Sequence, residues 1–139
     1  KGISEDQPSV TAGRQGHVLA VDDDPQILHL LQRSLEQDLY EVDVAGDGEE
    51  AWKLLQAKPY DCVVLDLRMP EMNGQELFQL IQESNGVLAN KVVFITGDTV
   101  DQDSQEFVAR QANPVMHKPF QLDDLMSVVR EVTAQPAEI

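Results

Sequence analysis

The stretch CVVLDLRMP, residues 62–70, places Val63, Val64 and Leu65 directly before Asp66. A short apolar run bounded by turn-forming residues is typical of a strand that is buried on both faces. Four other short apolar stretches are also strand candidates, at residues 17–21, 40–44, 92–95 and 115–116. With residues 62–65 they predict five strands.

Segments of helical periodicity separate these strands. Asp24 can cap a helix over residues 25–37, and Pro25 suits the first position of that helix. Asp47 with Glu50 three residues later resembles a capping box that opens a second helix. Three more helices are predicted at residues 74–84, 100–110 and 121–132. Strict alternation predicts a doubly wound α/β fold, (βα)₅, with a flavodoxin-like parallel sheet in the order 2-1-3-4-5.

The length of 139 residues, with 42% hydrophobic residues, predicts one domain. We place it at residues 17–133, after a linker or disordered arm at 1–16 and before a flexible tail at 134–139. Cys62 is the single cysteine, which fits a reducing cytoplasm. No stretch approaches the roughly 20 apolar residues that span a bilayer, so no membrane contact is expected.

The formal net charge of −15 disfavours direct binding to nucleic acid or anionic lipid, since such partners need clustered Lys and Arg. Two interpretations of the acidity remain open. It can be a solvated surface, or it can include a cleft that binds a cation. The positions of the acidic residues must distinguish them.

Polar residues follow four of the predicted strands. They are Asp22-Asp23-Asp24, then Asp66, then Thr96-Gly97, and finally His117-Lys118-Pro119. Ligands of doubly wound sheets bind at the carboxyl ends of the strands, so these residues should meet at one edge. Carboxylates crowded there repel one another unless a cation is bound, and an all-oxygen site favours Mg²⁺.

A carboxylate in that position can attack phosphorus, provided that charge on the incoming phosphoryl group is neutralised. Lys118 can neutralise one phosphoryl oxygen, and the hydroxyl of Thr96 can donate a hydrogen bond to another. The predicted chemistry is phosphoryl transfer to Asp66, which gives an acyl phosphate that water later removes.

With these features, the chain resembles the response-regulator receiver family over roughly residues 17–133. The resemblance is carried by VDDDP at 21–25, LDLRMP at 65–70 with Asn73-Gly74, Thr96-Gly97, and KPF at 118–120. It implies that Asp66 is the phosphoacceptor and that Thr96 and Lys118 bind the phosphoryl group. It also implies that Asp23 and Asp66 bind Mg²⁺ directly, that Asp22 does so through water, and that the backbone carbonyl of Arg68 completes the protein ligands.

The resemblance further implies a donor, a histidine kinase or a phosphotransfer histidine, and a protein that catalyses its own phosphorylation without being a conventional enzyme. Ile95-Thr96-Gly97-Asp98 and Asn113-Pro114 are similar to receivers fused to hybrid sensor histidine kinases. Val115 departs from the pattern, because many receivers carry an aromatic residue there. Arg68 and Asp98 have opposite charges and could form a lid over the phosphoryl group.

Three other functions fit the sequence less well. A phosphohydrolase of the haloacid-dehalogenase type needs a second acid two residues after its nucleophile, where this chain has Arg68. A flavodoxin-like cofactor binder needs a phosphate loop rich in Ser, Thr and Gly. A pseudo-receiver that only binds partners would not need the intact acids, Thr96 and Lys118. His17, His29 and His117 have no ligand spacing and are interpreted as structural.

Overall fold

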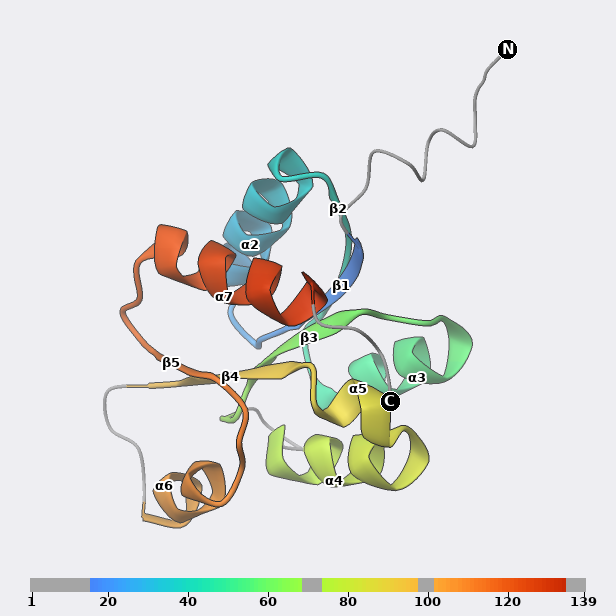
Figure 1. Ribbon diagram of the computed structural model, residues 1–139, viewed down its shortest axis with the longest axis vertical. Helices are drawn as coiled ribbons and strands as arrows, with labels where there is room; N and C mark the ends of the chain where they lie inside the picture. The colour runs from blue at the N-terminus through green and yellow to red at the C-terminus, as the bar shows by residue number, and fades with distance from the viewer. Residues whose placement is uncertain (1–15, 69–73, 98–101, 135–139) are drawn as a thin grey trace.

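The protein is built on a five-stranded parallel sheet with the order β2-β1-β3-β4-β5 (Figure 1). The computed structural model describes residues 16–68, 74–97 and 102–134. The strands are β1 (Gly16–Val21), β2 (Tyr40–Ala45), β3 (Cys62–Asp66), β4 (Val92–Thr96) and β5 (Val115–His117). Their order and parallel pairing confirm the predicted doubly wound fold.

Helices cover both faces of the sheet, as Figure 1 shows. One face carries α2 (Pro25–Gln37) and α7 (Leu122–Ala134). The other carries α3 (Gly48–Ala57), α4 (Gly74–Ser84), α5 (Gly86–Ala89) and α6 (Gln102–Ala109). None of the described helices is long and apolar enough to cross a lipid bilayer.

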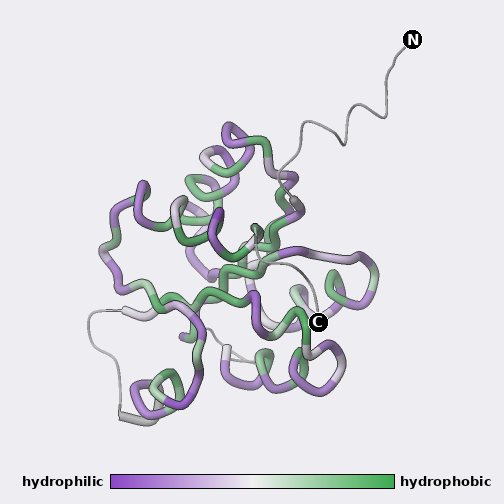
Figure 2. Tube along the Cα trace, in the orientation of Figure 1, coloured by the Kyte–Doolittle hydropathy of each residue, from purple (hydrophilic) through white to green (hydrophobic). Residues whose placement is uncertain are grey.

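Each face of the sheet has its own hydrophobic core. Val18, Ala20 and Val64 pack with Leu31 of α2 and Leu125 of α7. On the other face, apolar residues of β1, β3 and β4 pack against the buried side chains of α3 to α6. In Figure 2 the hydrophobic colour therefore concentrates along the strands, while the helices alternate between hydrophobic and hydrophilic residues.

The predicted elements agree with the structure within one or two residues. Asp24 caps α2 by accepting a hydrogen bond from Gln26 N, and Asp47 caps α3 by accepting one from Glu50 N. α5 was not predicted, because its four residues are too few to show a helical period. Residues 100 and 101 of the fourth predicted helix lie outside the described residues, as does most of the predicted arm.

Gly74, the first residue of α4, lies against the end of β3. A Cβ atom built on Gly74 would stand 2.6 Å from the carbonyl oxygen of Asp66 and 2.6 Å from Cα of Leu67. Both neighbours are backbone atoms, so neither can turn aside as a side chain can. The absence of a side chain at Gly74 therefore lets α4 approach the strand end that carries Asp66.

We predict that Gly74→Ala destabilises the protein by about 1–3 kcal/mol, the usual cost of forcing a methyl group into a packed site. Gly86→Ala is the matched control, since Gly86 also begins a helix and its added Cβ would meet no atom within 4 Å. Urea unfolding of both variants measures the effect. Equal midpoints for the two would contradict the close approach.

Candidate functional site

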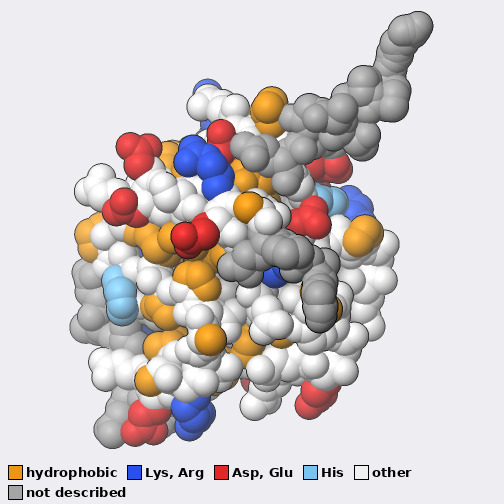
Figure 3. Space-filling view, in the orientation of Figure 1, with side chains coloured by type: hydrophobic (Ala, Val, Ile, Leu, Met, Phe, Trp, Pro, Cys, Tyr) orange, Lys and Arg blue, Asp and Glu red, His pale blue; other side chains and the backbone are white. Residues whose placement is uncertain are grey.

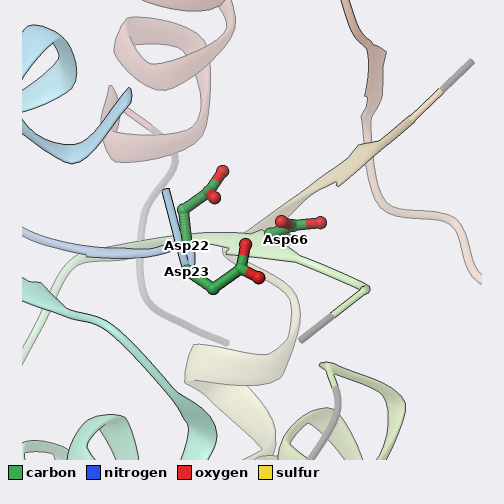
Figure 4. Close-up of side chains that lie close together, drawn as sticks. All are labelled: Asp22, Asp23 and Asp66. Atoms are coloured by element: carbon green, nitrogen blue, oxygen red, sulfur yellow. The ribbon is translucent and has the colours of Figure 1, made fainter. Parts of the chain in front are cut away.

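Three carboxylates gather at the carboxyl ends of β1 and β3 (Figure 4). One oxygen of each of Asp22, Asp23 and Asp66 lies within 4.8 Å of the other two. Asp22 and Asp66 are buried, with 0% and 3% of their surfaces exposed, whereas Asp23 is exposed. The cluster therefore has two buried acids and one side open to solvent.

The turn after β1 fixes Asp22. Its backbone N–H continues the pairing with β2 by donating to Ala45 O at 3.2 Å. Its side-chain Oδ1 accepts the N–H of Asp24 at 2.9 Å. Asp24 in turn caps α2, so it serves the helix and not the cluster.

Lys118, one residue after β5, brings a positive charge to the two buried acids. Its Nζ lies 3.1 Å from Oδ2 of Asp22 and 3.4 Å from Oδ2 of Asp66. Burial alone would lower the pKa of Lys118, but Asp66 and Asp22 together raise it above its ordinary value. The lysine is therefore held as a cation between them.

The environment of Asp66 opposes its ionisation. Burial, the largest effect, and the neighbouring charge of Asp22 raise the pKa of Asp66 to about 6. The backbone N–H of Arg68, which donates to Oδ1 at 3.0 Å, and the ammonium of Lys118 act in the opposite direction. Asp66 is therefore a buried carboxylate at a strand end, with partners for both of its oxygens.

Thr96 is buried at the end of β4, the strand next to β3. Asp66 pairs with Ile95, the residue before Thr96. Thr96 therefore lies at the same edge of the sheet as Asp66, as predicted. The hydroxyl of Thr96, however, is 2.9 Å from Nδ1 of His117 on β5. The interpretation of His117 as merely structural overlooked this contact with a site residue.

The charges and open geometry of the cluster fit a hard divalent cation. Three carboxylates face one ammonium, so two negative charges stay uncompensated when all are ionised. Oδ2 of Asp22 is buried, and its partner among the described residues is the ammonium of Lys118 at 3.1 Å. Carboxylate oxygens with an open side are the donors that Mg²⁺ prefers.

Parts of the predicted site fall outside the described residues. Met69, Pro70 and Asn73 do so, and so does Asp98, the acidic half of the lid that was predicted with Arg68. The side chain of Arg68 is exposed. The lid therefore stays a prediction.

The structure is thus a doubly wound α/β domain with three carboxylates and a lysine at the carboxyl edge of its parallel sheet. Residues 18–130 match the family of the response regulator receiver domain. The chain therefore belongs to that family, whose members are not conventional enzymes.

Curated relatives are similar to the chain over most of its length. It is 32% identical to the response regulator GtcR of Aneurinibacillus migulanus over 74% of the chain and 41% of the relative. It is 31% identical to the transcriptional regulatory protein TrcR of Mycobacterium tuberculosis over 81% of the chain and 43% of the relative. Transcription factor SKN7 of Saccharomyces cerevisiae is 29% identical over 87% of the chain and 19% of the relative. The chain thus spans about half or less of these relatives.

Solved structures give the same fold. The response regulator TrrA of Thermotoga maritima, in complex with Mg²⁺–BeF, is 31% identical with a TM-score of 0.73, over 84% of this chain and 97% of that one. Chemotaxis protein CheY4 of Vibrio cholerae is 30% identical with a TM-score of 0.73, over 84% of this chain and 97% of that one.

The raised pKa of Asp66 predicts a pH dependence of stability. The carboxyl group of Asp66 binds its proton more tightly in the folded protein than in the unfolded chain, where its pKa is about 4. The stability that Asp66 contributes is therefore present at low pH and is lost as the pH rises through about 6. Asp66→Asn should not show this loss, so its free energy of unfolding should gain on that of the wild type over this range.

Urea unfolding between pH 4 and pH 7.5 in EDTA, which keeps metal away from the cluster, measures that difference. Glu36→Gln, which removes a carboxylate from an exposed position on α2, is the control. A constant difference between Asp66→Asn and the wild type across the range would contradict the raised pKa.

Proposed function

We propose that this chain is a phosphoacceptor switch of a two-component phosphorelay, and that Asp66 receives a phosphoryl group from a histidine kinase or a phosphotransfer histidine. The observation that carries the proposal is the position of Lys118. Its ammonium lies 3.4 Å from Asp66 and 3.1 Å from Asp22, two of the three clustered acids. A phosphoryl group arriving at Asp66 would meet this cation.

The chemical step is a displacement at phosphorus. A carboxylate oxygen of Asp66 forms a new O–P bond while the N–P bond of the donor phosphohistidine breaks, and the electron pair returns to the imidazole nitrogen. Lys118 can exchange its contact with the carboxylates for one with a phosphoryl oxygen, and Thr96 can donate its hydroxyl proton to a second oxygen. The product is an acyl phosphate, which water can later hydrolyse.

The carboxylates of Asp23 and Asp66 would hold Mg²⁺ directly, together with the backbone carbonyl of Arg68, and Asp22 would hold it through water. When bound, the ion would neutralise negative charge on the phosphoryl group. Their clustering within 4.8 Å supports this ligand set. So does the relative TrrA, which was solved in complex with Mg²⁺–BeF.

The acidic composition makes a direct role in nucleic acid binding unfavourable for this domain. Among the described residues on the face seen in Figure 3, Lys and Arg side chains stand apart from one another and form no patch. The relatives named above are response and transcription regulators, and they lend no support to the hybrid-kinase parent that the sequence resemblance implies. The hybrid-kinase parent therefore stays a prediction.

Asp66→Asn should abolish phosphoryl uptake, because an amide is a poor nucleophile while its shape preserves the fold. The measurement is the gain of one phosphoryl mass after incubation with Mg²⁺ and acetyl phosphate. Asp24→Asn is the matched control, since Asp24 caps α2 and Asn caps a helix equally well. Uptake by the Asp66→Asn variant would refute the assignment of the acceptor.

Asp23→Ala should weaken Mg²⁺ binding by about tenfold, because it removes one of the three carboxylates. Relief of repulsion with Asp22 and Asp66 should leave the metal-free variant at least as stable as the wild type. Isothermal titration with Mg²⁺ and urea unfolding in EDTA measure the two effects. An unchanged Mg²⁺ affinity would remove Asp23 from the ligand set.

A further inference from the structure

The contact between Thr96 and His117 crosses from one strand to the next. The two residues are direct partners in the parallel pairing of β4 with β5. Oγ1 of Thr96 and Nδ1 of His117 are 2.9 Å apart, a full hydrogen bond. Thr96 is 1% exposed, while the His117 residue is exposed at the edge of the sheet.

Both partners have a fixed position. Lys118 N donates to Thr96 O at 2.8 Å, which ties the residue after His117 to the same point of β4. The β-branched side chain of Thr96 has restricted χ1 freedom, and its burial restricts it further. The imidazole therefore meets the hydroxyl as a consequence of sheet register.

A threonine hydroxyl has one proton to donate and can accept further hydrogen bonds. If Nδ1 of His117 carries no proton, it accepts a hydrogen bond from the Thr96 hydroxyl, which then has no proton to donate to a phosphoryl oxygen. If Nδ1 carries a proton, it donates to Oγ1 and the Thr96 proton is free. The state of Nδ1 therefore decides in which direction Thr96 can donate.

We propose that His117 is a positioning residue for phosphoryl transfer, in which Nδ1–H donates to Thr96 Oγ1 and directs the threonine proton to the phosphoryl group on Asp66. This inference rests on the proposed function. It predicts that removal of the imidazole weakens binding of the phosphoryl group without removing any group that touches it.

The test uses beryllofluoride, which stands in for the phosphoryl group, with Mg²⁺ and the full chain. His117→Leu removes the donor, whereas the side-chain amide of His117→Asn can place an N–H near the position of Nδ1. Each substitution is also made together with Thr96→Val, which lacks the hydroxyl. Thermal unfolding of every variant identifies any general loss of folding.

We expect His117→Leu to lose roughly fivefold in beryllofluoride affinity, the effect of about one hydrogen bond, and His117→Asn to recover most of it. In the Thr96→Val background the Leu substitution should cost nothing further, as expected for coupled residues. In nitrogen-15 spectra, beryllofluoride should move Nδ1 of His117 toward its protonated signal in the wild type and not in Thr96→Val.

Three results would overturn the inference. The affinity of His117→Leu could equal or exceed that of the wild type, its loss could persist in Thr96→Val, or Nδ1 could lose its proton when beryllofluoride binds. If any of these results is found while the wild type binds beryllofluoride and gains a phosphoryl group, the proposed function stays intact. A wild type that does neither rejects the proposed function and this inference together.

Discussion

The burial of two carboxylates beside a single lysine is the constraint on which the rest of the site depends. Water is largely excluded from Asp22 and Asp66, so their mutual repulsion is weakly screened. Lys118 is within 3.4 Å of both and compensates only part of it. A cluster that favours added positive charge and carries a nucleophilic oxygen can receive both a metal and a phosphoryl group. The repulsion between the buried carboxylates therefore both destabilises the empty site and favours the binding of a cation there.

Much of the fold could be predicted because the strands are buried on both faces. The five residues of β3 and of β4 are all buried, so each strand appears in the sequence as an almost unbroken apolar run. The acids were found for a related reason, since Asp22 and Asp66 stand where such runs stop. Sequence order alone then places them at one edge of a parallel sheet.

Contacts that depend on register or on close backbone approach could not be predicted. No sequence period indicates that His117 pairs with Thr96, because β5 has only three residues and its alignment with β4 is a tertiary property. Asn113, just before β5, donates to Ala89 O and Val92 O and so contacts both the end of α5 and the start of β4. Such polar side-chain bonds have no local signal.

Val115 separates this chain from receivers that carry an aromatic residue there, and the packing gives that difference a physical meaning. Phe78, Phe94 and Phe107 stack edge to face with ring centroids 5.0–5.7 Å apart, and Val115 packs against the core that contains them. Phe107 is the one buried side chain among those described in α6, so it attaches the helix to the sheet.

A β-branched Val115 has no ring to swing between buried and exposed positions. Among the described residues, backbone shifts of β4 and β5 and the phenylalanine cluster remain as routes by which α6 can respond to events at Asp66. Thr96 and His117 lie on the same face of the sheet as Phe94 and Val115, two residues further along their strands. The hydrogen bond between them thus connects the acid site to the edge strand in the region where many relatives use an aromatic side chain.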